Sequence, residues 1–273
     1  MIARQYFQEL QNLPHNNDLT KKYCDRFCGI LVVDGKYVNV KGYEQKIPLL
    51  WGLDYLSHDI PVFTLAPSES YQSWLKYFGY LKSIRYPLQI VICDDNENIQ
   101  QAARYIFPGV MIQICQNHFL ENIRRDLSVR TEEKYRGLVF DLKRELFTVK
   151  LTRPDFAKRA FKLLKKYEGN QIALNVIVRI HQRFMDLTAA SLIPHAPTTT
   201  NIIESYNSHL QARLKSIKAF QSFPGASKWL NGYILRRRYR KFTDCGKKFR
   251  SLNGKTSISQ TLKKGTILPL LFI

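Results

Sequence analysis

Apolar and polar residues follow strand-like patterns over the first part of the chain. Three short apolar runs, rich in β-branched and aromatic residues, cover residues 30–40, 46–55 and 60–66. Runs of this length joined by short polar loops predict three successive strands, of which the first two form a hairpin. A helix is predicted next, from a cap at Ser68 or Ser70 to about Lys82, because apolar residues recur there at helical spacing.

The pattern then changes to alternating strands and helices. The continuous apolar run over residues 88–94 predicts a buried parallel strand, residues 99–107 a helix, and the run over residues 110–115 a further strand. Three meandering strands followed by crossover connections are typical of the ribonuclease H-like mixed sheet, an α/β fold. Right-handed crossovers in that fold place the middle of the first strand beside the carboxyl end of the fourth.

A long helical segment precedes the last predicted helix of this core. From His118 to about Leu192 the apolar residues recur only at helical spacing, which predicts an all-helical insertion. A proline-rich link then leads to a helix from Asn201 to about Ile217. We therefore expect an N-terminal helix and linker, the first part of the core, the helical insertion, and a final core helix with a basic C-terminal tail, over residues 1–29, 30–117, 118–197 and 198–273.

The composition favours an intracellular protein with an anionic partner. The 273 residues carry a formal net charge of +20, and 45% of them are hydrophobic, enough for a substantial core. Nucleic acid is the first partner to consider. A membrane is not expected, because no apolar stretch approaches the roughly 20 residues that span a bilayer and the N-terminus lacks a signal-peptide core. Five scattered cysteines make no disulfide framework, so we expect a cytoplasmic, DNA-associated protein.

Three acidic residues occur within or next to the predicted core elements. Asp34 interrupts the first apolar strand, Asp94 ends the fourth, and Glu204 belongs to the start of the final core helix. An ionised carboxylate taken out of water costs several kcal/mol unless a cation or hydrogen-bond donors compensate it. Because the predicted topology brings these elements to one end of the sheet, we expect the three carboxylates to form one metal site.

Each of these acids also has a local explanation. Asp34 could pair with Lys36 on its own strand, Asp94 fits a capping box with Glu97, and Glu204 fits another at the start of its helix. The shared position in the topology favours the metal site instead. Mg²⁺ prefers oxygen ligands, and two such ions held by carboxylates support an in-line displacement at a phosphate.

The sequence around the three acids forms an ordered set of short motifs. These are Val33-Asp34-Gly-Lys-Tyr, then Cys93-Asp94 with Phe107-Pro-Gly and Cys115-Gln-Asn-His118 downstream, then Thr199-Thr-Asn-Ile-Ile-Glu204-Ser-Tyr-Asn-Ser-His-Leu-Gln-Ala-Arg213-Leu-Lys. In this order they resemble the catalytic domain of the Mutator-like (MULE-type) family of DDE transposases, over roughly residues 30 to 255. The resemblance implies a ribonuclease H-like core with a helical insertion before the last acid.

The resemblance also implies a specific function. A DDE transposase cleaves transposon-end phosphodiesters and joins the freed strand to target DNA by a two-metal mechanism, and Asp34, Asp94 and Glu204 fall on its catalytic, metal-binding acids. Mg²⁺ is the expected cofactor, with Mn²⁺ as the alternative. The expected partners are double-stranded DNA, as transposon ends and target, and further copies of the chain. A homodimer or higher oligomer on DNA is expected, because two ends must be joined together.

Further residues are expected to assist. Cys115 and His118 match the family's Cys/His signature, and an accessory role in structure or DNA orientation competes evenly with a plain core position. A zinc site with Cys24 and Cys28 is not expected, because no four-ligand spacing is visible. Cations after Glu204 and in the basic tail are expected to contact DNA phosphates, unless they form only a solvated surface. These cations are Arg213, Lys215, Arg236, Arg237, Arg238, Arg240 and Lys241.

Two other functions fit the same sequence. A truncated or inactive transposase remnant would bind DNA without Mg²⁺-dependent cleavage. Such proteins usually carry a DNA-reading module ahead of the first strand, and the short segment there is expected to mean a truncated reading frame, one half of a split transposase, or a catalytic core that depends on another protein to recognise the ends. Another ribonuclease H-like nuclease, such as a resolvase, is the second alternative. The helical insertion and the Cys/His pair argue against it.

Overall fold

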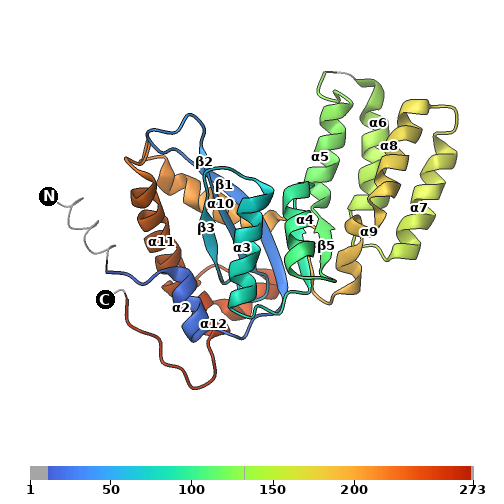
Figure 1. Cartoon of the computed structure of the whole chain (residues 1–273). Helices are drawn as coiled ribbons and strands as arrows, with labels where there is room; N and C mark the ends of the chain where they lie inside the picture. Colours follow the sequence, from blue (N-terminus) through green and yellow to red (C-terminus); the bar gives the residue numbers. More distant parts are fainter. Residues whose placement is uncertain (1–11, 132, 272–273) are drawn as a thin grey trace. The chain divides into compact units, whose positions relative to one another are not determined.

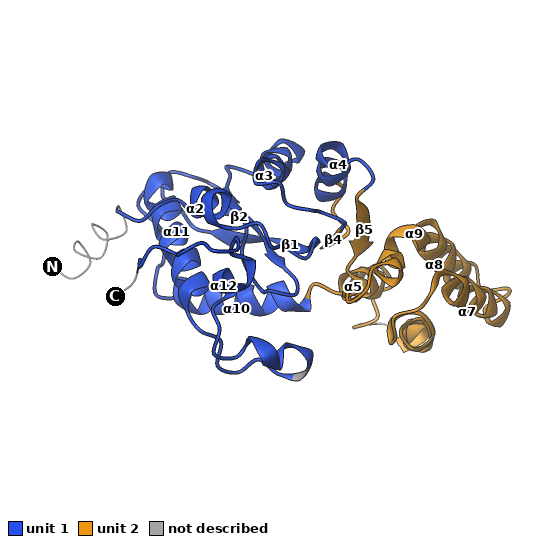
Figure 2. Ribbon diagram, turned by 90° about the horizontal axis from the view of Figure 1, so that it is seen from below, with its two compact units in different colours: residues 1–89, 98–109, 201–273 blue, residues 90–97, 110–200 orange. Residues whose placement is uncertain are grey.

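The computed structural model describes residues 12–131 and 133–271, and the chain divides into two compact units (Figure 1 and Figure 2). Unit 1 consists of residues 1–89, 98–109 and 201–273, and unit 2 of residues 90–97 and 110–200. Of the N-terminal helix and linker predicted over residues 1–29, residues 1–11 lie outside the described part. In the sequence, unit 2 therefore interrupts unit 1 twice.

Unit 1 contains the three predicted antiparallel strands. They are β1 (Ile30–Val38), β2 (Ile47–Asp54) and β3 (Phe63–Leu65), in the order β3-β2-β1. β2 is buried along its whole length. Gly52 of β2 is paired with Val33 of β1, and a Cβ at Gly52 would meet Val33 Cγ1 at 2.9 Å and the Tyr77 hydroxyl at 2.6 Å. Only glycine allows this close approach of the side chains that cover β2.

Helices from distant parts of the sequence complete unit 1. In chain order they are α2 (Asn16–Tyr23), α3 (Tyr71–Ser83), most of α4 (Glu97–Ile106), α10 (Asn201–Leu214), α11 (Phe223–Tyr239), the 3₁₀ helix η4 (Lys247–Leu252) and α12 (Ser257–Thr261). α3 begins at one of the two predicted caps, where the Ser70 hydroxyl accepts a hydrogen bond from the Ser73 N–H. The structure corrects one prediction, because α2 replaces part of an expected polar linker, and α11 lies partly within the predicted basic tail.

α11 is buried on one side because small and apolar residues recur along it at four-residue steps. Ala226, Leu230 and Ile234 form this row, and Arg238 continues it. The side chain of Arg238 is 0% exposed, so it cannot belong to the DNA-contacting surface predicted from the run of basic residues. A buried guanidinium needs an ion-pair partner and hydrogen-bond acceptors to offset its lost hydration.

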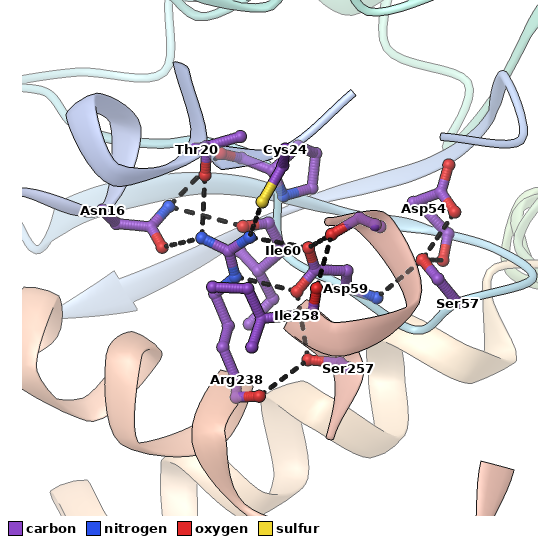
Figure 3. A network of polar contacts seen from close by, with 12 residues as sticks. Asn16, Thr20, Cys24, Asp54, Ser57, Asp59, Ile60, Arg238, Ser257 and Ile258 are labelled. Carbon is purple, nitrogen blue, oxygen red and sulfur yellow. Dashed lines mark hydrogen bonds and ion pairs between the residues drawn. The ribbon is translucent and has the colours of Figure 1, made fainter. Parts of the chain in front are cut away.

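Arg238 is at the centre of a buried polar network within unit 1 (Figure 3). Its Nε and Nη2 donate to the two carboxylate oxygens of Asp59 at 2.8 and 2.6 Å, and Asp59 is also 0% exposed. Its Nη1 donates to Asn16 Oδ1 and Thr20 Oγ1 of α2 at 2.8 and 2.7 Å. Two hydroxyl groups of α12 donate to Asp59 as well. The network therefore joins α2, α11 and α12 to the segment that follows β2.

The same network keeps Asp59 ionised. Burial by itself raises the pKa of a carboxyl group. The Arg238 guanidinium and the hydroxyl groups of Ser257 and Thr261 outweigh burial and hold the pKa of Asp59 below its ordinary value. Removing either member of this ion pair would leave an uncompensated charge in the core.

Unit 2 combines a pair of strands with a group of helices. β4 (Ile90–Cys93) and β5 (Met111–Ile114) pair in parallel. The chain continues through α5 (Gln116–Asp126), η1 (Glu133–Tyr135), α6 (Arg136–Leu142), the π-helical η2 (Lys143–Phe147), α7 (Arg153–Lys166), α8 (Gln171–Gln182), α9 (Phe184–Leu187) and η3 (Ala189–Leu192). The segment predicted to be helical thus contains helices, turns and loops, and no strand, among its described residues.

Apolar side chains from these helices form the core of unit 2. Leu142, Leu146, Phe156 and Ile177 are each 0% exposed and belong to one cluster with residues of α5. Strand pairing is antiparallel in unit 1 and parallel in unit 2, so the protein belongs to the mixed α/β class. Within residues 12–131 and 133–271, none of the helices combines the length and the apolar character that a bilayer crossing demands.

Candidate active site

Asp34 lies within β1, at the position predicted from the sequence. Its carboxylate is partly exposed and accepts hydrogen bonds from Gly35 and Asn207 within unit 1. Oδ1 accepts from the Gly35 N–H at 2.8 Å, and Oδ2 accepts from the side-chain Nδ2 of Asn207 at 2.5 Å. A carboxylate in an apolar strand requires such partners, and an amide that is remote in the sequence supplies one of them.

Asn207 is not singled out by the sequence patterns above. It is 8% exposed, and its Oδ1 accepts a hydrogen bond from the indole Nε1 of Trp51 at 3.1 Å. Because an indole N–H can only donate, Oδ1 of Asn207 faces Trp51 and the NH₂ group faces Asp34. Trp51 is the direct partner of Asp34 in the pairing of β1 with β2. One signal does exist in the sequence, because Asn207 interrupts the apolar row that Ile203 and Leu210 form on α10.

Glu204 belongs to the first turn of α10 and is partly buried. It precedes Asn207 by three residues, so both side chains project from neighbouring positions on one face of the helix. α10 packs against β1 within unit 1. Because Asn207 contacts Asp34, the face of α10 that carries Glu204 also contacts the first predicted acid. Unit 1 therefore brings together the elements that carry two of the three acids.

Asp94 directly follows β4 and belongs to unit 2. Its Oδ1 is 2.5 Å from Nδ1 of His118, which lies in the first turn of α5. The hydrogen bond to Asp94, followed by that to Cys115, raises the pKa of His118 to about 11. His118 is therefore an imidazolium that forms an ion pair with Asp94.

Cys115 extends this contact into a longer polar chain. Its Sγ accepts hydrogen bonds from the backbone N–H and the hydroxyl of Thr200 at 3.4 and 3.2 Å, and the Thr200 hydroxyl is 3.3 Å from His118 Nδ1. Burial raises the pKa of Cys115, but hydrogen bonds to His118 and Thr200 outweigh burial and lower it overall. One ligand atom from each of Asp94, Cys115 and His118 lies within 4.8 Å of the others. The predicted Cys/His pair thus adjoins the second predicted acid.

The predicted residues therefore occur in two groups. Unit 1 holds Asp34 and Glu204 on elements that pack together, and unit 2 holds Asp94 with Cys115 and His118. The meeting of the three carboxylates in a single metal site stays a prediction from the sequence.

The cations predicted to contact DNA have three different environments. Those exposed to solvent are Arg213, Lys215, Arg236, Arg240 and Lys241. Arg237 is partly buried, and its guanidinium lies over the rings of Tyr206 and Phe242 at 4.7 and 5.5 Å from their centres. Arg238 is buried in its ion pair, which contradicts the prediction that it contacts phosphate. The reason is that Arg238 continues the buried row of α11 rather than the exposed side of that helix.

Comparison with protein families identifies the chain. The family model described as "Transposase, Mutator family" matches residues 19–236, a range that includes Asp34, Asp94 and Glu204. The chain belongs to the Mutator family of transposases. Comparison with curated proteins finds no match. Family membership implies that DNA is the substrate of this Mutator-family chain, and it confirms the resemblance that the short motifs indicated.

Proposed function

We propose that this Mutator-family chain is the catalytic domain of a DNA transposase with a ribonuclease H-like core. It would cleave phosphodiesters at transposon ends with Mg²⁺ and transfer the freed strands to target DNA by a two-metal mechanism. Asp34, Asp94 and Glu204 would be its catalytic acids. The observation that supports this proposal most is the contact of Asn207 with Asp34, which joins the first acid to the helix face that carries the last one.

The three acids fit a hard divalent cation. Carboxylate oxygens are the ligands that Mg²⁺ prefers, and Mn²⁺ accepts the same ligands. Asp34, Asp94 and Glu204 are all partly exposed, which gives water and phosphate access to them. When bound by these carboxylates, Mg²⁺ would lower the pKa of a water molecule and stabilise negative charge on the phosphate.

Neighbouring side chains would position these carboxylates. The amide of Asn207 fixes the orientation of Asp34 and carries no net charge, so this contact does not neutralise the carboxylate. His118 contacts Oδ1 of Asp94, and Cys115 holds His118 in turn. Contacts of this kind orient ligands and commonly change metal affinity or activity by about 10–100-fold when they are removed.

The proposed reaction needs no covalent intermediate with the protein. A water oxygen forms a bond to phosphorus, the bond from phosphorus to the 3′ oxygen breaks, and the 3′ oxygen leaves as a hydroxyl group. The oxygen of this hydroxyl then forms a bond to a phosphorus of the target DNA, the bond from that phosphorus to the target's own 3′ oxygen breaks, and the target strand leaves with a 3′-hydroxyl group. Because two transposon ends are joined to one target, a homodimer or a higher oligomer would act on the DNA.

The test is Mg²⁺-dependent cleavage by the purified full chain of DNA that carries the sequences flanking its reading frame. Asp34→Asn, Asp94→Asn and Glu204→Gln should each abolish cleavage and retain DNA binding. Glu168→Gln, which changes an exposed carboxylate that follows α7, should cleave like the wild type. Unchanged cleavage in Asp34→Asn and Asp94→Asn would refute the assignment. DNA binding by the wild type without any Mg²⁺-dependent cleavage would favour an inactive DNA-binding remnant instead.

A further inference from the structure

A concave surface on unit 2 has a strongly basic lining. The cavity has a volume of about 1170 Å³ and is lined by residues of α5, α6 and η2 and the segment between α5 and α6. We call this surface the α5 groove; the arginines and lysine that line it are Arg124, Arg125, Arg130, Arg136, Lys143 and Arg144. Glu121 is the single acidic side chain among the described residues that line it. The α5 groove therefore carries a large excess of positive charge.

The cations of the α5 groove, apart from Arg144, are available to a ligand; Arg144 is paired with the poorly exposed carboxylates of Asp141 and Glu145. Arg130 is 90% exposed and shares the Glu121 carboxylate with Arg124, so one negative charge is divided between two guanidinium groups. Arg136 is paired with Glu133 at the surface. Exposed ion pairs of this kind contribute little to stability, so a phosphate group can replace the carboxylates.

The α5 groove extends along α5 from the second predicted acid. His118 lines the groove and also contacts Asp94. From His118 to Arg125 the helix rises by roughly 10 Å, at about 1.5 Å per residue. One strand of DNA presents a phosphate about every 3.4 Å along the duplex axis, so a groove of this length can contact more than one phosphate. A strand in the groove would therefore reach the side chain that binds Asp94.

We propose that the α5 groove binds the phosphate backbone of a DNA strand and leads it to Asp94. The proposal depends on the proposed function in one respect, which is that DNA is taken to be the anionic partner. Side-chain contacts to phosphate position DNA without reading its bases. We therefore expect binding in the groove to be independent of base sequence. Its affinity should fall steeply with rising salt concentration, because binding releases counterions from the phosphates.

The test measures binding of the full chain to a fluorescent DNA duplex by anisotropy, without divalent ions, at several salt concentrations. The double variant Arg130→Gln/Lys143→Gln should bind roughly tenfold or more weakly, and the slope of log affinity against log salt should fall by about one for each lost phosphate contact. The matched control Lys158→Gln/Lys162→Gln removes two exposed cations from α7 of the same unit and should bind within about twofold of the wild type. The charge-preserving variant Arg130→Lys/Lys143→Arg should also retain binding.

The outcomes separate the groove from general surface charge. Unchanged binding in the groove variant, or equal losses in the groove and control variants, would overturn the proposal. All four substituted side chains are exposed, and thermal unfolding of each variant establishes that the fold is retained. The binding comparison does not depend on cleavage, so it stands even where the substitutions of Asp34 and Asp94 disprove the catalytic assignment. Conversely, a failure of the groove leaves the cleavage experiment intact.

Discussion

Nδ2 of Asn207 lies 2.5 Å from Oδ2 of Asp34, and the same amide accepts a hydrogen bond from Trp51. The amide therefore bridges β1, β2 and α10 within unit 1. Its orientation is fixed, because the indole can only donate and the carboxylate accepts. Asn207 thus holds the first predicted acid in place from the helix that carries the last one.

Asn207→Leu is expected to lower Mg²⁺-dependent cleavage by about 10–100-fold and to raise the Mg²⁺ concentration at half-maximal rate. Leucine suits the apolar row of α10, but it removes the donor to Asp34. The indole N–H of Trp51 also loses its acceptor, which should cost about 1–3 kcal/mol of stability. Cleavage rates over a Mg²⁺ titration, together with chemical unfolding, measure both effects.

Ser208→Ala is the matched control for this prediction. Ser208 is the next residue of α10, is exposed, and donates its hydroxyl hydrogen to the backbone oxygen of Glu204. Its removal should leave the Mg²⁺ dependence unchanged. A wild-type Mg²⁺ response in Asn207→Leu would contradict a positioning role for the amide.

Asn207 also illustrates what could be predicted from the sequence. Apolar periodicity predicted the strands and most of the helices, and short motifs predicted the family, because these signals are local. The partner of Asp34 could not be identified, since it is 173 residues away in the chain. What the sequence does contain is a polar residue in an apolar row of α10, and such a residue indicates a buried hydrogen bond without naming its partner.

Arg238 is a residue whose environment was predicted wrongly from a local pattern in the sequence. A run of basic residues predicts an exposed surface, and Arg236 and Arg240 are indeed exposed. Four-residue spacing from Leu230 and Ile234 places Arg238 on the buried side of α11 instead. Its partner Asp59 is 179 residues earlier in the chain, so composition alone could not separate Arg238 from its neighbours.

Arg238→Met is expected to destabilise the protein by about 3–5 kcal/mol, because it leaves the Asp59 carboxylate buried without its cation. Arg236→Met, on the exposed side of the same helix, should change the free energy of unfolding by no more than about 0.5 kcal/mol. Urea unfolding of both variants measures the difference. Adding Asp59→Asn to Arg238→Met should recover part of the loss, and no recovery would show that the cost comes from packing rather than from the uncompensated charge.

Gly52 and Gly79 should respond to alanine in opposite directions. At Gly52 a Cβ would meet the Tyr77 hydroxyl at 2.6 Å and a Val32 backbone oxygen at 3.0 Å, so Gly52→Ala should destabilise unit 1 by about 1–3 kcal/mol. At Gly79, within α3, a Cβ meets nothing within 4 Å, so Gly79→Ala should stabilise by roughly 0.5–1 kcal/mol. Chemical unfolding of the two variants checks the signs, and equal effects would contradict the close packing over β2.

His58 is a buried base whose protonation the fold opposes. Its ring lies against Phe249 at 4.2 Å between centres, and the side chain is 8% exposed. Burial, followed by the positive charges of Arg237 and Lys248, lowers the pKa of His58 to about 4. The neutral imidazole is therefore the form that the folded protein accommodates.

The protein should consequently lose stability as the pH falls from about 6.5 to about 4. In this window the unfolded chain protonates His58 and the folded protein does not, so the unfolded state binds more protons and gains free energy relative to the folded one. The contribution of neutral His58 to the free energy of unfolding is fully present above about pH 6.5. Roughly 2–3 kcal/mol of that contribution is lost by pH 4.5.

His58→Asn removes the titration, and asparagine tolerates the positive φ of 55° at this position. Unfolding free energies of the wild type and His58→Asn should therefore converge or cross in acid, whereas the exposed His209→Asn variant of α10 should follow the wild-type curve. Parallel curves for the wild type and His58→Asn between pH 7 and pH 4.5 would rule out His58 as the source of the acid sensitivity.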